Sequence, residues 1–163
     1  MDRILVPLAS LLVGLFVFTQ SASLPDTVAS RFDMAGHPVG FMPRGVYMAI
    51  MLVASSGLPL LIWAMVMRMT RHGRLNVPNA AHWLAAPRRE ATLRFLRLHT
   101  DTFSIVLCVF MGWVSWLVAA ANRLPTGAAD SPVGLPLMVG VGGFMAFVVV
   151  WVLVRLLRFR RRR

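Results

Sequence analysis

The sequence of 163 residues contains little charge, a single cysteine and no lysine. Charged residues make up 14% of the chain, against about 25% in a typical soluble domain, and hydrophobic residues make up 58%. The lone Cys108 lies within an apolar run, which excludes a disulfide within the chain and a cysteine-based metal cluster. This composition is typical of a membrane protein.

Four apolar runs contain no charged residue at all: Ile4 to Ala22, Val46 to Met67, Thr102 to Ala121 and Val133 to Val154. A helix of about 20 apolar residues crosses the hydrocarbon core of a bilayer, so we expect an all-α protein with four transmembrane helices in one integral membrane domain, residues 1–163. The first run could instead be a cleaved secretory signal, because "MDR" precedes it and "SAS" resembles a cleavage site. Its length exceeds the apolar region of a typical signal, which favours a retained helix.

The net charge of +11 falls on two segments. The loop between the second and third runs holds seven arginines against Glu90 and Asp101, and six arginines follow the fourth run: Arg155, Arg158, Arg160, Arg161, Arg162 and Arg163. Arginines near span ends remain on the cytoplasmic side, so we expect both termini and the middle loop there. The last six arginines are interpreted as a topological anchor that also binds anionic lipids, with a specific lipid, RNA or protein partner as alternatives; no nucleic acid is expected.

The middle loop changes character along its length. Gly73 and Pro78 indicate irregular chain, and from Pro87 the pattern predicts an amphipathic helix that runs on into the third span, with Glu90 and Arg94 as an i, i+4 ion pair. Asp101, at the membrane boundary, is expected to meet arginines of this loop. The residues predicted to form the cytoplasmic face are Trp83, Arg88, Arg89, Arg94 and Arg97.

Three histidines, His72, His82 and His99, fall in or beside this loop. Their spacing matches no short metal-ligand pattern and no carboxylate cluster accompanies them, so we interpret them as interfacial polar residues and expect no metal and no cofactor. A metal site and a pH-responsive role for His99 are the alternatives.

The spans themselves lack ionisable groups, which argues against a self-sufficient ion transporter, and no catalytic constellation is apparent, which argues against an enzyme. Small residues occur on the third span at Cys108, Gly112, Ser115 and Ala119 and on the fourth at Gly142 and Ala146. They predict close helix contacts, either within the chain's own bundle or with a second copy or partner. "GLP" at residues 57–59 predicts a kink in the second span.

The segment "LPDTVASRFDMAGHPVGF", residues 24–41, joins the first two spans. Residues 28–32 can be extended, "DMAG" has turn chemistry, and Pro38 permits only an edge strand, so we expect a hairpin-like cap over the outer helix ends. Phe32 and Phe41 are predicted to pack onto those ends.

This segment resembles the bacterial membrane domain of unknown function that forms the N-terminal part of SdpI-type immunity proteins. The matching positions are Leu24, Pro25, Asp26, Phe32, Gly36 and Gly40, and a second block matches at Pro78, Asn79, Trp83, Leu84, Pro87, Arg88 and Arg89, with "WLVAAAN" ending the third span at Asn122. The chain has Arg31 where that family has histidine. The resemblance implies a bacterial cytoplasmic membrane and recognition of a secreted peptide toxin.

The leading hypothesis is a non-enzymatic membrane protein of the SdpI-like sensor or immunity type, which recognises an outer-side ligand or membrane partner through the cap. The candidate binding residues are Pro25, Asp26, Arg31, Phe32, Gly36, His37 and Gly40. One alternative is an accessory subunit that stabilises a larger membrane complex. The other is a lipid or peptide transport component, which requires a cavity.

Overall fold

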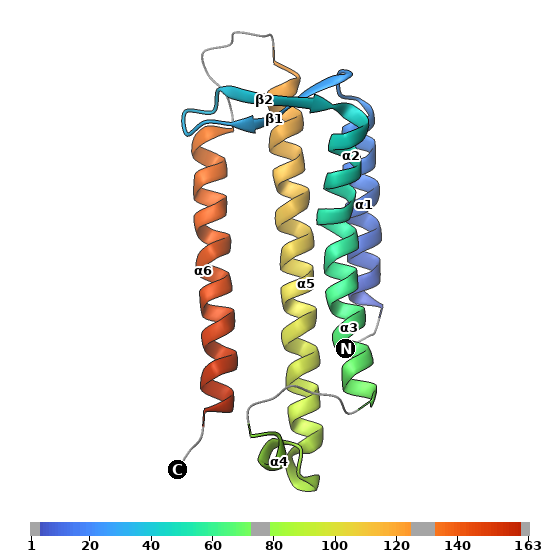
Figure 1. Ribbon diagram of the computed structural model, residues 1–163, viewed down its shortest axis with the longest axis vertical. Coiled ribbons are helices and arrows are strands. Elements are labelled where there is room, and N and C mark those ends of the chain that lie inside the picture. Colours follow the sequence, from blue (N-terminus) through green and yellow to red (C-terminus); the bar gives the residue numbers. More distant parts are fainter. Residues whose placement is uncertain (1–3, 73–78, 125–132, 161–163) are drawn as a thin grey trace.

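The computed structural model describes residues 4–72, 79–124 and 133–160, and those residues are mostly helical. The elements in chain order are α1 (Leu5–Ala22), β1 (Thr27–Phe32), β2 (Pro38–Pro43), α2 (Arg44–Leu52), the π-helical turn η1 (Val53–Gly57), α3 (Leu58–His72), α4 (Ala80–Trp83), α5 (Ala86–Asn122) and α6 (Gly134–Phe159). The long helices run side by side, with the hairpin of β1 and β2 across one end of the bundle and α4 at the other (Figure 1).

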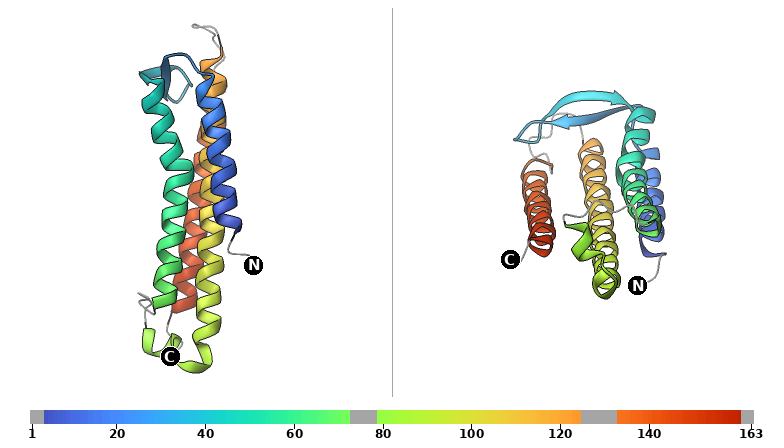
Figure 2. Two further views of the ribbon diagram at one scale, coloured as in Figure 1. Left: turned by 90° about the vertical axis from the view of Figure 1, so that its right-hand side faces the viewer. Right: turned by 60° about the horizontal axis from the view of Figure 1, so that its bottom comes forward.

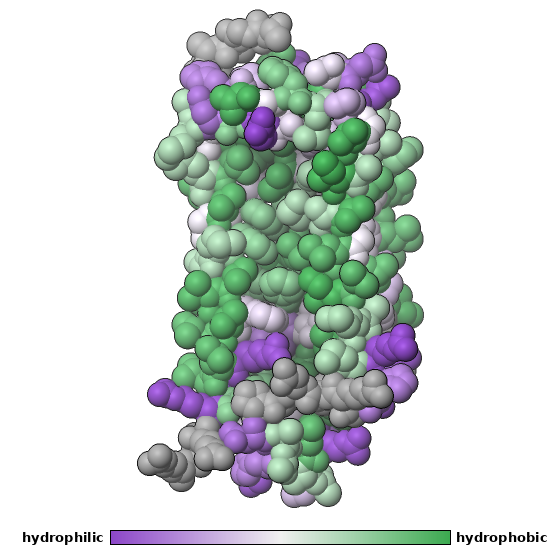
Figure 3. Space-filling model, in the orientation of Figure 1, coloured by the Kyte–Doolittle hydropathy of each residue, from purple (hydrophilic) through white to green (hydrophobic). Residues whose placement is uncertain are grey.

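Among the described residues, four helical stretches are long and apolar enough to cross a membrane: Leu5–Ala22, Arg44–His72, Ala86–Asn122 and Gly134–Phe159. The outer surface of the bundle shows an apolar band between two more hydrophilic ends (Figure 3). The prediction of four helices long and apolar enough to span a membrane is therefore confirmed, and these helices fit a multi-pass membrane protein. The helices extend beyond the apolar runs, and α5 is continuous from Ala86, so the predicted amphipathic helix and the third span form one helix.

The centre of the bundle is packed by small side chains of α1, η1 and α5. The Ser10 Oγ and Cys108 Sγ atoms lie 3.6 Å apart, Gly14 leaves room for Ser56, and Gly112 contacts Val13. The small residues of the third span are buried here, from Cys108 to Ala119. Packing within the chain's own bundle is thus the correct interpretation for this helix face.

The helix α6 packs against α5 through aromatic rings and stands at the side of the bundle (Figure 2). The ring centroids of Phe110 and Phe144 are 4.3 Å apart, and those of His99 and Trp151 are 4.2 Å apart in nearly parallel planes. Gly140 faces the indole of Trp113 so closely that a side chain there would overlap it. Along the rest of its length α6 presents apolar side chains outward.

The second span contains a π-helical turn where the sequence predicted a proline kink. The backbone N–H of Leu58 donates to the carbonyl of Val53, five residues back, and Pro59 follows directly. A proline lacks an N–H and its ring crowds the carbonyl four residues earlier, so a wider turn at this point relieves the conflict.

The predicted hairpin is confirmed. Antiparallel β1 and β2 pair Thr27 with Pro43 and Arg31 with Gly40, with irregular register on either side of Arg31. Gly36 in the turn has a φ of 87°, a conformation in which glycine has no side-chain clash. Phe32 packs against the buried cluster beneath the hairpin as predicted, but Phe41 is 61% exposed, so its predicted packing onto the helix ends is wrong. The alternation of the strand turns Phe41 outward, because Met42 occupies the inward position.

Candidate functional site

The hairpin is attached to the end of α5 by the side-chain amide of Asn122. The backbone N–H of Ala29 donates to Asn122 Oδ1 at 2.8 Å, and Asn122 Nδ2 donates to the carbonyls of Ala29 at 2.9 Å and Val118 at 2.8 Å. The amide thus acts as a strand partner for β1 at the helix end. The hydrogen-bonding groups of Ala29, which is buried, are satisfied by this side chain.

A second attachment holds the connection between α1 and β1. Arg44 Nη1 donates to the carbonyl of Leu24 at 2.9 Å and to that of Ala22 at 3.3 Å, while Arg44 Nη2 lies 3.2 Å from Asp26 Oδ1. The Asp26 side chain is 94% exposed, so this ion pair contributes little energy and mainly orients the two side chains.

The turn of the hairpin is closed by Asp33 and His37. The backbone N–H of His37 donates to Asp33 Oδ1 at 2.8 Å, and the imidazole Nδ1 lies 3.2 Å from Oδ2. The hydrogen bond from that N–H lowers the pKa of the Asp33 carboxyl below its usual value. The turn is therefore fixed by a carboxylate that is ionised at neutral pH.

The candidate binding residues of this cap divide into two groups. Gly36 and Gly40 are buried and Phe32 is partly buried, whereas Pro25, Asp26, Arg31 and His37 are exposed. The guanidinium of Arg31 lies over Gly40, where a larger residue would displace it. The structure adds three exposed apolar side chains that the sequence did not single out for binding: Met34 at 76%, Val39 at 60% and Phe41 at 61% exposure.

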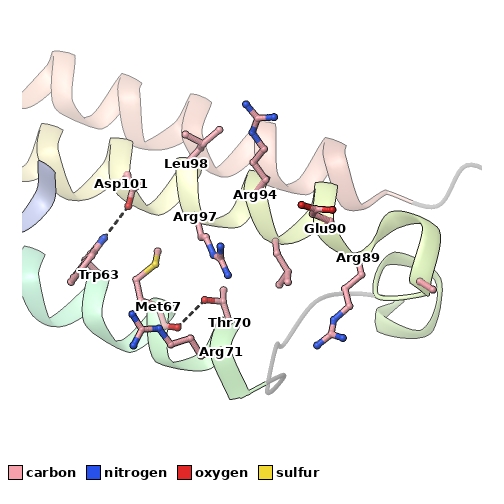
Figure 4. Close-up of a pocket in the computed structure, with 12 residues that line it drawn as sticks. Trp63, Met67, Thr70, Arg71, Arg89, Glu90, Arg94, Arg97, Leu98 and Asp101 are labelled. Carbon is pink, nitrogen blue, oxygen red and sulfur yellow. Dashed lines mark hydrogen bonds between the residues drawn. The ribbon is translucent and has the colours of Figure 1, made fainter. Parts of the chain in front are cut away.

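The opposite end of the bundle contains a groove between α3 and α5, with a volume of about 680 Å³ (Figure 4). Its walls include the predicted Arg89, Arg94 and Arg97, together with Arg71 and Trp63, which the sequence did not mark as site residues. Arg71 could have been suspected from its place at the end of the second span, but the face of α3 that it occupies depends on how the helices pack.

Two indoles contact α5 at this level. Trp63 Nε1 donates to Asp101 Oδ1 at 2.9 Å, and Trp151 Nε1 donates to the carbonyl of His99 at 3.0 Å. The predicted ion pair of Glu90 with Arg94 is wrong, because among the described residues these side chains do not come within 4 Å of each other. Asp101 likewise has no arginine within 4 Å among the described residues, and of the loop arginines Arg97 acts on it through longer-range charge attraction. Instead Asp101 takes its hydrogen bond from Trp63 of α3.

The remaining residues of the predicted cytoplasmic face lie beside the end of α6. Trp83 packs edge-on against Phe159, with ring centroids 5.6 Å apart, and Arg88 lines a second cavity with Arg158 and Arg160. Of the predicted lipid contacts, residues 161–163 lie outside the described residues, Arg155 and Arg158 lie in the last turns of α6, and Arg160 follows it. Within the described residues no three His, Cys, Asp or Glu side chains gather in a group that could hold a metal ion.

No protein-family model, curated protein or solved structure matches this chain. The resemblance to the SdpI-type membrane domain therefore rests on the motif residues of segment 24–41 and the two blocks that follow.

Proposed function

We propose that this chain is a non-enzymatic membrane protein that recognises a ligand or a membrane partner through the outer surface of its hairpin. This proposal rests on one observation: hydrogen bonds fix the backbone of the hairpin to the helix ends, while several of its side chains remain exposed. Asn122 and Arg44 fix its backbone to the helix ends, while Arg31, Val39 and Phe41 remain exposed. Binding residues are commonly found on such loops held by a rigid scaffold.

The exposed side chains are of the kinds that binding surfaces favour. Arginine, methionine and aromatic residues are enriched in protein–protein interfaces, and here Arg31, Met34 and Phe41 occur in one short hairpin. Exposed apolar residues on a fixed backbone lose little conformational entropy when a partner covers them. Such a surface suits a peptide or a protein segment that combines apolar side chains with an acidic group.

The arginine distribution supports a location in the bacterial cytoplasmic membrane with the hairpin outside. The groove and the end of α6 carry the excess of arginine, and such residues remain on the cytoplasmic side. An outward hairpin agrees with a role of the SdpI-like sensor or immunity type, in which the ligand is a secreted peptide.

The alternative is an accessory subunit, and the outward face of α6 favours it. Added side chains at Gly142 and Gly143 would meet nothing within 4 Å, so this face could receive a helix of a larger complex. The transport hypothesis needs a path across the bundle, and the cavities described above lie at the arginine end, which gives such a path no support.

The test is purification in a mild detergent from the source membrane, with mass spectrometry of stoichiometric partners. Three forms are compared: the wild type, the hairpin variant Arg31→Ala/Phe41→Ser, and the α6 variant Gly142→Leu/Gly143→Leu. Loss of a bound partner in the hairpin variant alone supports recognition by the hairpin. Loss in the α6 variant alone contradicts it and supports the accessory subunit.

A further inference from the structure

We propose that the groove between α3 and α5 binds the phosphate of an anionic membrane lipid. Three arginines carry this inference. Arg97 extends from α5 toward α3, Arg89 points to the same side nearer the start of α5, and Arg71 lies along α3 beneath Met67, whereas Arg94 points to the other side of α5 (Figure 4). This site is independent of the hairpin.

The guanidinium groups of these arginines are available to a ligand. Among the described residues, none of Arg71, Arg89 and Arg97 donates a hydrogen bond to a protein acceptor or lies within 4 Å of a carboxylate. The nearby Asp101 accepts a hydrogen bond from the indole of Trp63 and interacts with Arg97 through charge attraction without a close ion pair. Each guanidinium presents five N–H donors in a planar arrangement that matches the oxygens of a phosphate.

The groove lies at the level where lipid head groups lie. At 1.5 Å per residue, the part of α5 from Asp101 to Asn122 is about 31 Å long, which matches the hydrocarbon core of about 30 Å. The hairpin bounds this layer at Asn122, and Trp63 and Trp151 bound it near Asp101, as tryptophans do at a membrane interface. The arginines lie just beyond Asp101, in the head-group region.

The shape of the groove suits a lipid rather than a small ion alone. Its volume of about 680 Å³ is in the usual range for ligand sites, and Met67, Leu93 and Leu98 give it apolar walls beside the arginines. The phosphate of a lipid would meet the arginines while its glycerol and the first methylene groups follow the apolar walls toward the membrane.

The charge of the groove favours anionic lipids over zwitterionic ones. The three arginines on the groove side, Arg71, Arg89 and Arg97, outnumber the acidic residues Glu90 and Asp101 by one. An arginine near a membrane surface contributes about 1 kcal/mol to the binding of anionic lipid, which corresponds to about fivefold in affinity.

The experiment is a lipid titration of the purified full chain in a neutral detergent, followed by native mass spectrometry. The probes are phosphatidylglycerol and phosphatidylcholine with the same acyl chains. The groove variants are Arg71→Gln and Arg97→Gln, and the matched control is Arg68→Gln, an exposed arginine of α3 outside the groove. Circular dichroism verifies that each variant keeps its helix content.

We expect the wild type to bind phosphatidylglycerol more tightly than phosphatidylcholine. The concentration for half-saturation should rise about fivefold in each groove variant and less than twofold in Arg68→Gln. Equal binding of the two lipids by the wild type, or equal weakening in all three variants, overturns the proposal.

A competition experiment distinguishes a membrane lipid from a soluble phosphate compound as the ligand of the groove. Glycerol phosphate is added at millimolar concentration to the wild type loaded with phosphatidylglycerol. Retention of the lipid supports the membrane lipid as the ligand, because its acyl chains contribute to binding. Displacement by glycerol phosphate overturns the lipid assignment and makes the groove a site for a soluble phosphate compound.

Discussion

Replacing Asn122 by alanine should loosen the hairpin without unfolding the bundle. The substitution removes three hydrogen bonds and leaves the N–H and the carbonyl of Ala29 without their partner. A buried polar group left unsatisfied costs about 1–3 kcal/mol. Ala29 is 8% exposed and water reaches it poorly, so we expect the opening of β1 to become easier by about 2 kcal/mol.

Hydrogen exchange of the Ala29 amide, measured by NMR in detergent, gives this quantity directly. A change of about 2 kcal/mol predicts about 30-fold faster exchange at Ala29, while amides in the middle of α5 keep their protection. The matched control is Arg123→Ala, whose lost bonds go to Gln20 and Ser23 of the α1 end instead of β1. An unchanged exchange rate at Ala29 in Asn122→Ala would refute the reasoning.

Two further predictions concern α6 and the hairpin turn. Gly140→Ala should lower the unfolding free energy in detergent by about 1–3 kcal/mol, because the added methyl overlaps Trp113. The control Gly143→Ala should change the unfolding free energy little, because no atom lies within 4 Å of the added methyl. Equal effects of the two substitutions would contradict the α5–α6 contact. Asp33 has a folded-state pKa below its unfolded value, so its stabilisation of the turn is present above the unfolded pKa and is lost as the pH falls through the folded pKa. The His37 amide should therefore be better protected from exchange in the wild type than in Asp33→Ala at neutral pH, and a difference that stays constant as the pH falls through the range in which the Asp33 carboxylate is protonated would count against this account.

The spans, the hairpin and the continuity of α5 could be predicted from the sequence, because residues close together in the chain determine them. The four spans follow from uncharged runs of sufficient length, and the hairpin follows from the turn chemistry between Asp33 and Gly36 together with Pro38. The continuity of α5 follows from an amphipathic pattern that meets an apolar run without an intervening glycine or proline. These are the parts of the fold in which neighbouring residues decide the outcome.

The remaining features depend on residues that are far apart in the sequence. Asn122 meets Ala29 across 93 positions, and Trp63 meets Asp101 across 38, so neither pair leaves a local pattern. Phe41 was assigned to the wrong side because a one-residue change of register turns every side chain of a strand to the other face, and β1 has irregular register beside Arg31. Which arginines line the groove depends likewise on the rotation of α3 against α5.

The most direct test of the central proposal is photo-crosslinking in the source membrane from two positions of the full chain. A photoreactive amino acid replaces Phe41 on the hairpin or Val150 on α6, both of which are exposed apolar residues. Recognition by the hairpin predicts a discrete adduct from position 41, which Arg31→Ala removes, and none from position 150. A discrete adduct from position 150 alone, or one from position 41 that persists in Arg31→Ala, would contradict it.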